Sequence, residues 1–508
     1  MKHLGAVVFC VAATAVFSPG AEGATVSCES LRMLRLPNAT IDVAAGVPAG
    51  NFLRPGAGGQ PQTFNGLPAF CRIAATLKPT PQSDIKIEVW LPVTWNGKFQ
   101  AVGNGQWAGT ISYGAMASAL RAGYATTSTD TGHVGNNAEF AVNAEKLVDY
   151  SWRSEHEMTL KAKAIIAAFY GTAPRFSYWN GCSTGGRQGL KEATLFPREF
   201  DGLVVGAPAN HRASRNSWQM DIIASVHRNP AGMLSEAKLN LINRAALDAC
   251  DGLDGVKDGL LENPKICRFD PAVLTCRGTE NGTCLTPAQV TIAKRILSPG
   301  KLANGREYQP GLEISSVLGH YGNRLPGWAA WAQLGSEPAP NDNFTYVVYK
   351  DPKWDWRNFQ LEAALPLAEK ANAIETAHAA DLSMFLQGGG KIIFFHGWSD
   401  PSVAPQATIN YFGEVQKISA RAAESTRLFL VPGMGHCVGG AGATDNFDAV
   451  AALDRWVTAQ TPPQSIPASR VEGGRVTRAR PLCPYPQVAK FDGTGSTDEA
   501  ANFACAAP

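Results

Sequence analysis

Two blocks of alternating strand and helix signals, separated by a long stretch with few strand signals, constrain the fold of this 508-residue chain more than any other feature. Residues 84–92 alternate polar and apolar side chains, as a half-buried strand does. Similar strand signals lie within residues 97–109, 124–133, 176–181 and 200–209, and they return within 389–405 and 426–437. This alternation predicts an α/β fold, a parallel sheet whose order is interrupted by a large inserted lid domain.

The chain therefore divides into four expected segments. Residues 1–23 carry a short basic start, an apolar run and a small-residue cleavage pattern, and so predict a signal peptide. Residues 24–209 and 383–508 are the expected first and second parts of the core, and residues 210–382 are the expected lid. A cleaved signal peptide predicts a secreted or periplasmic protein.

Composition narrows the class of partner. Apolar residues make up 45% of the chain and charged residues 17%, and the formal net charge is +2. Such a balance gives no basis for nucleic acid or an anionic membrane surface as partner. No segment after the signal peptide approaches the roughly 20 apolar residues that a membrane-spanning helix needs.

A serine turn lies at the centre of the first block. Residues 178–190 read YWNGCSTGGRQGL and contain the pattern Gly-x-Ser-x-Gly around Ser183. A strand signal precedes the turn and a helix signal follows it, which is the context that this pattern requires. Gly181, Gly185 and Gly186 leave room for a sharp backbone turn. The motif predicts that Ser183 is a nucleophile, with an ordinary glycine-rich turn as the alternative.

A nucleophilic serine needs a base and a carboxylate to orient that base. Asp400 and His436 each follow a late strand signal, and the chain order Ser, Asp, His is that of the α/β-hydrolase arrangement. His396 competes with His436 as the base. Because it stands at a strand end just before Asp400, a structural or pocket role is expected for it.

The oxyanion formed during nucleophilic attack on a carbonyl group is normally stabilised by two N–H donors. One is expected from Thr184, the residue after the nucleophile, and the other from the glycine-rich loop at 103–109, with Gln106 or Gly105 as candidates. Asp130 and His133 form a second acid and base pair in the sequence TDTGH. A structural turn is the favoured interpretation of that pair.

Ten cysteines follow the signal peptide, an even number that predicts full pairing in an oxidising compartment. Proximity in the sequence suggests Cys250–Cys267, Cys276–Cys284 and Cys483–Cys505. Cys182 precedes Ser183 and Cys437 follows His436, so a triad would bring these two thiols within reach of a disulfide. Two independent buried thiols are the alternative. The remaining cysteines are Cys28 and Cys71.

A loop within the expected lid reads CDGLDGVKDGLLENPKIC, from residue 250 to residue 267. Asp251, Asp254 and Asp258 could wrap their carboxylates around a cation, and hard oxygen ligands of this kind suit Ca²⁺. The spacing is not that of an EF-hand. A solvated Asp-Gly turn is the alternative, and any bound ion is expected to be structural.

These features together resemble the tannase and feruloyl esterase family. The resemblance is carried by the Cys-Ser and His-Cys pairs, Asp400, the GCSTGGRQ turn, the following FPREFDGLVVGAPA segment and the Asp/Gly loop. It implies an α/β-hydrolase core with a lid inserted after the strand near Val204, and a disulfide joining the cysteines next to Ser183 and His436. It also implies a Cys28–Cys71 disulfide, and Ca²⁺ held by the three aspartates with the carbonyls of Val256 and Leu260.

The resemblance further implies a serine esterase that acts on esters of aromatic acids. Feruloyl and similar hydroxycinnamoyl esters, free or on a polysaccharide fragment, are the first expectation. Galloyl esters and mono(2-hydroxyethyl) terephthalate are the alternatives, and no lid arginine suited to a terephthalate carboxylate is evident. Aromatic lid residues could stack on an aromatic acyl group, or could form the lid's own core: Trp218, Trp328, Trp331, Phe344, Tyr346, Trp354 and Trp356. A catalytically inactive binding protein on a hydrolase scaffold is the alternative outside enzymes.

Overall fold

The computed structural model describes residues 25–54, 62–320, 327–332, 340–418 and 420–508. The predicted signal peptide lies outside the described residues. Within them, no helix is both long enough and apolar enough to cross a bilayer.

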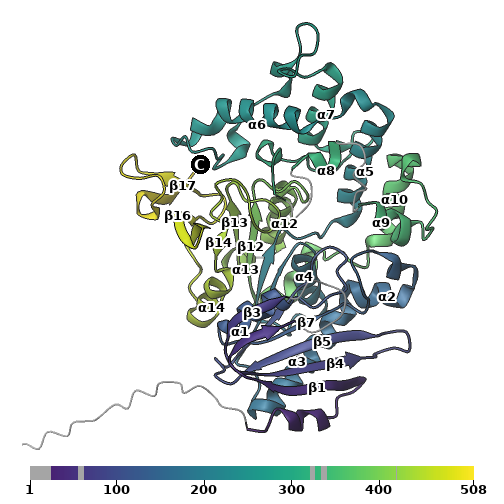
Figure 1. The fold of residues 1–508 in the computed structure, drawn as a ribbon, viewed down its shortest axis with the longest axis vertical. Coiled ribbons are helices and arrows are strands. Elements are labelled where there is room, and N and C mark those ends of the chain that lie inside the picture. The colour runs from purple at the N-terminus through teal and green to yellow at the C-terminus, as the bar shows by residue number, and fades with distance from the viewer. Residues whose placement is uncertain (1–24, 55–61, 321–326, 333–339, 419) are drawn as a thin grey trace, which may run out of the picture.

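A nine-stranded sheet forms the core, in the order β1-β4-β5-β7-β6-β8-β9-β12-β13 (Figure 1). The bounds are β1 Ala39–Val47, β4 Phe70–Leu77, β5 Ile85–Pro92, β6 Lys98–Val102, β7 Ala125–Thr129, β8 Phe176–Cys182, β9 Gly202–Gly206, β12 Lys391–Gly397 and β13 Thr426–Val431. From β7 to β13 all neighbours are parallel. The strands β1, β4, β5 and β7 pair antiparallel, which corrects the expectation of a wholly parallel sheet. The chain between β4 and β5 is short, and a short connection produces an antiparallel pair because a parallel one needs a crossover.

Helices cover both faces of this sheet. Their bounds are α1 Tyr113–Arg121, α2 Ala144–Val148, α3 Ser154–Tyr170, α4 Thr184–Leu195, α11 Ser383–Gln387, α12 Pro405–Ile418, α13 Ala420–Ser425 and α14 Ala449–Ala459. Leu203 and Val205 of β9 pack in one buried cluster with α3, α4 and α12, whereas Val204 packs in another with α14. The alternation follows from the two-residue period of a strand, and it explains why β9 is apolar throughout.

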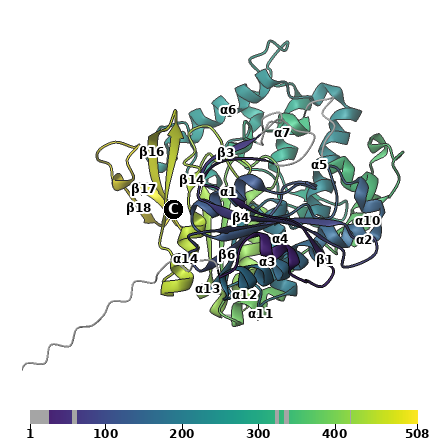
Figure 2. The same ribbon diagram turned by 60° about the horizontal axis from the view of Figure 1, so that its bottom comes forward.

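The segment between β9 and β12 has a core of its own, built mainly from helices. The bounds are α5 Arg212–Arg228, α6 Glu236–Cys250, α7 Pro287–Leu297, α8 Ala329–Ala332, α9 Pro340–Asp342 and α10 Leu361–Asn372, with short strands β10 Gly300–Lys301 and β11 Glu307–Gln309. In Figure 2, as in Figure 1, α5, α6 and α7 lie together on one side of the helices that cover the sheet. Ala377, Ala379 and Leu382 pack in the cluster of the sheet and not in the cluster of these helices. We call residues 210–382 the lid.

Smaller strands complete the fold. Their bounds are β2 Gly50–Leu53, β3 Thr63–Leu67, β14 Asn446–Phe447, β15 Ile466–Glu472, β16 Arg475–Leu482, β17 Val488–Phe491 and β18 Phe503–Ala506. The C-terminal strands lie beside β13 and reach toward the part of the lid near α6 (Figure 1). Arg478 and Arg480 on β16 both pair with Asp258 of the lid, so the C-terminal segment ties the lid to the core.

Candidate active site

Ser183 lies in a tight turn between β8 and α4. Its backbone has φ 61° and ψ −121°, a conformation that non-glycine residues rarely adopt and that costs on the order of 1–3 kcal/mol. The neighbouring glycines explain how the turn fits, since a Cβ added to Gly181 or Gly186 would lie 2.4 Å or 2.6 Å from a backbone oxygen. Ser183 N–H donates to the Gly206 carbonyl at 2.9 Å, which fixes the turn against the end of β9. The Ser183 side chain is thereby held at the carboxyl end of the parallel strands.

Asp400 and His436 come together at the same end of the sheet, after β12 and β13. His436 Nδ1 lies 2.6 Å from Asp400 Oδ2. The other carboxylate oxygen, Oδ1, accepts from the N–H groups of Ser402 at 2.7 Å and Val403 at 2.9 Å. Burial alone would raise the pKa of Asp400, but His436 and His396 beside it outweigh burial and lower that pKa below its ordinary value. Asp400 is therefore an ionised carboxylate that holds Nδ1 of His436.

His396 contacts the same carboxylate oxygen of Asp400 as His436 does. Its Nε2 lies 3.1 Å from Asp400 Oδ2 and 3.0 Å from the Val403 carbonyl. Both partners are acceptors, so Nε2 carries a proton and donates to them. His396 is fully buried and its Nδ1 lies 2.8 Å from the Thr408 hydroxyl. It thus has the structural role that its position suggested, and it supports the carboxylate directly.

The disulfide between Cys182 and Cys437 connects the serine turn with the histidine loop. It links residues 255 apart in the sequence, with a Cα–Cα distance of 6.0 Å. Because Cys182 precedes Ser183 and Cys437 follows His436, the bond holds the two candidate catalytic segments next to each other. All four other predicted pairs are also formed: Cys28–Cys71, Cys250–Cys267, Cys276–Cys284 and Cys483–Cys505.

The loop at 103–109 lies against the start of α4. Gln188 Oε1 accepts from the Asn104 N–H at 2.9 Å, and Thr184 Oγ1 donates to the Gln106 carbonyl at 2.8 Å. A Cβ on Gly103 would lie 2.5 Å from Gly185 Cα, so glycine is required for this approach. The contacts bring Gln106 beside Thr184, the two residues expected to donate to an oxyanion.

Asp130 and His133 are engaged in their own turn. Asp130 Oδ1 accepts from the N–H groups of Lys86 and Gly132, each at 2.9 Å. His133 Nε2 lies 2.6 Å from the Trp107 carbonyl, and its ring stacks on Phe140 at 3.9 Å between centroids. These partners agree with the structural interpretation of the pair.

The aspartate loop of the lid is closed by its own backbone. Asp251 accepts from the N–H groups of Asp258 and Gly259, while Asp254 accepts from Val256 at 2.9 Å. Burial raises the pKa of Asp254, and the charge of Asp258 adds to that rise. Among the residues that the structure describes, no three His, Cys, Asp or Glu side chains group closely enough to hold a metal by themselves.

Most of the aromatic lid residues are lid core. Trp218, Trp328, Trp331 and Phe344 are at most 3% exposed and belong to one buried cluster, against which Trp354 and Trp356 pack. Tyr346 packs elsewhere, against a cluster that contains Trp107 and Tyr150. For the four buried residues, the lid-core interpretation is therefore the right one.

Two residues that the sequence did not single out support the 103–109 loop. Tyr150 donates its hydroxyl to the Gln106 carbonyl at 2.7 Å, and Arg212 donates to the Tyr150 oxygen at 2.8 Å. Neither belongs to a local motif, and they are 62 residues apart in the sequence. Only the folded structure brings them together.

Comparisons with known proteins agree over most of the chain. Residues 71–506 match the family model described as tannase and feruloyl esterase. An uncharacterised esterase of Xanthomonas campestris pv. campestris is 34% identical, with 95% of this chain and 91% of that protein covered. The mono(2-hydroxyethyl) terephthalate hydrolase of Piscinibacter sakaiensis is 33% identical, with 87% and 85% covered. The crystal structure of feruloyl esterase B from Aspergillus oryzae superposes with a TM-score of 0.87 at 30% identity, over 94% of this chain and 99% of that one.

Proposed function

The chain belongs to the tannase and feruloyl esterase family, and from this premise we propose that it is a serine esterase that cleaves carboxylic esters of aromatic acids through Ser183, His436 and Asp400. One observation carries the assignment of these residues. A strained serine turn is joined by the Cys182–Cys437 disulfide to a histidine whose Nδ1 lies 2.6 Å from a buried, ionised carboxylate. This is the arrangement of a nucleophile, a base and the group that orients the base.

The mechanism follows from which ring nitrogen of His436 is already hydrogen-bonded to Asp400. Asp400 holds Nδ1 of His436, so Nε2 is the nitrogen that exchanges protons with Ser183 Oγ. Ser183 Oγ attacks the ester carbonyl as Nε2 takes its proton, and the same proton then leaves with the alcohol. Water attacks the acyl-enzyme, gives a proton to Nε2, and releases the aromatic acid as Ser183 regains its hydrogen.

The tetrahedral intermediate carries a negative oxygen. The N–H of Thr184, at the start of α4, and an N–H of the 103–109 loop at Gln106 or Gly105 are the proposed donors. Both belong to backbone that is held before substrate arrives, so little reorganisation is needed during the reaction.

Feruloyl and other hydroxycinnamoyl esters are the proposed substrates, either as small esters or as feruloylated polysaccharide fragments. The similarity to feruloyl esterase B of Aspergillus oryzae supports this choice. Galloyl esters and mono(2-hydroxyethyl) terephthalate are the second candidates, the latter because the Piscinibacter sakaiensis relative carries that name.

The test measures turnover of methyl ferulate, methyl gallate and mono(2-hydroxyethyl) terephthalate by wild-type protein, Ser183→Ala and Ser118→Ala. Ser118 is exposed on α1 and serves as the matched control. We expect Ser183→Ala to lose activity by about 10⁴-fold or more, with Ser118→Ala unchanged. Retained turnover in Ser183→Ala would overturn the mechanism, and the wild-type order of kcat/KM decides the substrate.

We also propose that the lid holds a structural Ca²⁺ through the carboxylates of Asp251, Asp254 and Asp258 and the carbonyls of Val256 and Leu260. The donor set is all oxygen, which suits this ion. The raised pKa of Asp254 beside Asp258 supports the proposal, since a cation would relieve the repulsion between two neighbouring, partly buried carboxylates. Arg478 and Arg480 already pair with Asp258, so they supply part of that compensation.

Elemental analysis of gently purified protein should find about one Ca²⁺ per chain. We expect a chelator to lower the melting temperature of the wild-type protein by several degrees and Asp254→Asn to abolish this effect. Protein that contains no Ca²⁺ and melts at the same temperature with and without chelator would rule out the site.

Export is the third proposal, with a mature chain that starts near Ala24 in a secreted or periplasmic protein. The five disulfides support an oxidising compartment. Mass measurement of the mature N-terminus after expression of the full chain in an exporting host tests it. An intact Met1 in the mature protein would contradict it.

A further inference from the structure

The Gln106 carbonyl is held by two hydroxyl groups from different parts of the fold. Tyr150 Oη donates to it at 2.7 Å and Thr184 Oγ1 at 2.8 Å. Gln106 itself has φ 53°, a backbone conformation that is strained for a residue with a side chain. Such a conformation persists only where its surroundings hold it, and here the two hydroxyls hold the peptide between Gln106 and Trp107.

Besides donating to Gln106, the Tyr150 oxygen accepts a hydrogen bond from another donor. Arg212 is that donor, with its Nη2 at 2.8 Å from Tyr150 Oη. Tyr150 is fully buried, and burial raises the pKa of its hydroxyl above the ordinary value, so the proton stays on the oxygen. The direction of the hydrogen bonds is thereby fixed from Arg212 through Tyr150 to Gln106.

Arg212 connects the two ends of the lid. It is the first residue of α5, where the lid begins, and its Nε lies 2.9 Å from the carboxylate of Glu375, near the end of the lid. Its guanidinium lies over the Trp107 ring, 3.9 Å from the ring centroid. Arg212 and Glu375 are 3% and 1% exposed, so this ion pair is shielded from solvent.

We propose that Tyr150 and Arg212 are positioning residues that hold the 103–109 loop in the geometry needed to stabilise the oxyanion. Through these two residues, the two ends of the lid are coupled to that loop. The inference rests on the proposed function, in which this loop supplies the second donor. Arg212 and Glu375 lock the two ends of the lid together, and Tyr150 carries that constraint to Gln106. The Thr184 hydroxyl donates to the same Gln106 carbonyl. The side chain of one proposed oxyanion donor, Thr184, therefore holds the backbone of the other, Gln106.

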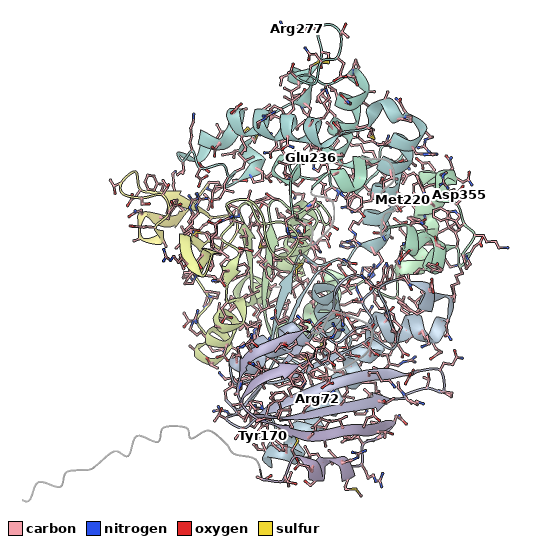
Figure 3. The ribbon with its side chains drawn as sticks, in the orientation of Figure 1. Arg72, Tyr170, Met220, Glu236, Arg277 and Asp355 are labelled. Atoms are coloured by element: carbon pink, nitrogen blue, oxygen red, sulfur yellow. A yellow bond between two sulfur atoms is a disulfide. The ribbon has the colours of Figure 1, made fainter. Side chains whose placement is uncertain are left out.

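The test uses Tyr150→Phe in the full mature protein, because this change removes one oxygen and keeps the ring packed 5.2 Å from Trp107. Tyr170→Phe is the matched control. Tyr170 is also buried and donates to a backbone carbonyl, that of Pro92 at 2.6 Å, but it lies toward the opposite end of the molecule from the lid residue Met220 (Figure 3).

Activity is measured with methyl ferulate and with its thionoester, in which sulfur replaces the carbonyl oxygen. Sulfur is a weak hydrogen-bond acceptor, so the preference for the oxygen ester reports on the oxyanion donors and not on general folding. We expect Tyr150→Phe to lower kcat by about 10- to 100-fold with little change in KM, and to reduce the oxygen-over-sulfur preference. Tyr170→Phe should keep both quantities.

Two further variants guard against a folding defect. Thr184→Val removes the other hydroxyl, and its combination with Tyr150→Phe should cost less than the product of the single effects, because both hold one carbonyl. Arg212→Lys keeps the charge but loses the paired contacts, and should lower the same preference. If wild type is active and Tyr150→Phe and Arg212→Lys keep its kcat and its preference, the inference is wrong. If wild type cleaves none of the three esters, or Ser183→Ala is active, the proposed function fails instead.

Discussion

Glu192 is a buried carboxyl group on α4, the helix that begins directly after Ser183. It is 1% exposed, and among the described residues neither of its carboxyl oxygens has a hydrogen-bond partner. Burial, and then the nearby charge of Glu155, raise its pKa well above the ordinary value of 4.5. Burial likewise raises the pKa of Glu155 to about 7. The folded protein therefore holds Glu192 in its neutral form.

This raised pKa makes stability depend on pH. Below pH 4.5 the group is protonated in both states and adds no pH-dependent cost. Above pH 4.5 the unfolded chain loses the proton first, which favours the unfolded state and lowers the stability of the protein as pH rises. We expect Glu192→Met to remove this cost, so that its gain in unfolding free energy over wild type grows as pH rises from about 4.5. Each unit of pKa rise is equivalent to about 1.4 kcal/mol.

Denaturant unfolding at pH 5, 6.5 and 8 measures the effect, with Glu424→Met as the matched control on the exposed side of α13. The control should show no such trend. A stability difference for Glu192→Met that is the same at all three pH values would show that the carboxyl is not neutral in the fold.

At the scale of the elements, the Cys182–Cys437 disulfide joins the turn between β8 and α4 to the loop that follows β13. This bond closes a loop of 255 residues, and a cross-link of this length constrains the unfolded chain by about 5 kcal/mol in the chain-entropy description. Its position adds a second effect, because the bonded residues are the immediate neighbours of Ser183 and His436.

The double variant Cys182→Ser/Cys437→Ser should therefore lose activity while still folded. We expect kcat/KM to fall by about 10-fold or more at a temperature where circular dichroism still shows native structure, since small misplacements of reacting groups are costly. Cys276→Ser/Cys284→Ser is the control, because that disulfide closes an 8-residue separation within the lid. Equal activity in the two double variants would show that the Cys182–Cys437 disulfide does not position the catalytic residues.

At the scale of the whole molecule, the lid completes the loop that carries Asp400. Three backbone carbonyls of this loop accept hydrogen bonds from lid side chains: Trp398 from Ser315 at 2.9 Å, Pro401 from Trp331 at 2.7 Å and Ser402 from Gln219 at 2.9 Å. The His436 N–H donates to the carbonyl of His320, also in the lid, at 2.8 Å. Asp400 and His436 are thus held by the lid as well as by the sheet.

Trp331→Phe tests this coupling. It removes the bond to Pro401 while keeping an aromatic ring, and we expect kcat to fall about fivefold, the equivalent of about 1 kcal/mol. Trp218→Phe is the control, because Trp218 is equally buried in the lid and its indole N–H has no partner among the described residues. Equal kcat values for the two variants, at equal stability, would contradict a role of the lid in holding Asp400.

The features that sequence reasoning predicted are those that depend on local chain chemistry. The turn at Ser183 is encoded by the nearby Gly181, Gly185 and Gly186, and the strands before Asp400 and His436 by short apolar runs. Chain order then placed the three residues at one edge of the sheet, because parallel strands end on the same side. The Cys182–Cys437 bond followed from that placement and is present in the structure.

Tertiary structure alone decided which partners hold these residues. Nothing local in the sequence links Tyr150 to Arg212, or Trp331 to Pro401, since each contact joins residues 62 or 70 positions apart. The antiparallel edge of the sheet and the use of lid tryptophans as core were likewise open, because a run of apolar residues has the same pattern whichever neighbour covers it. The sequence by itself thus determined the candidate catalytic residues and their order, whereas packing between distant segments decided how firmly each is held.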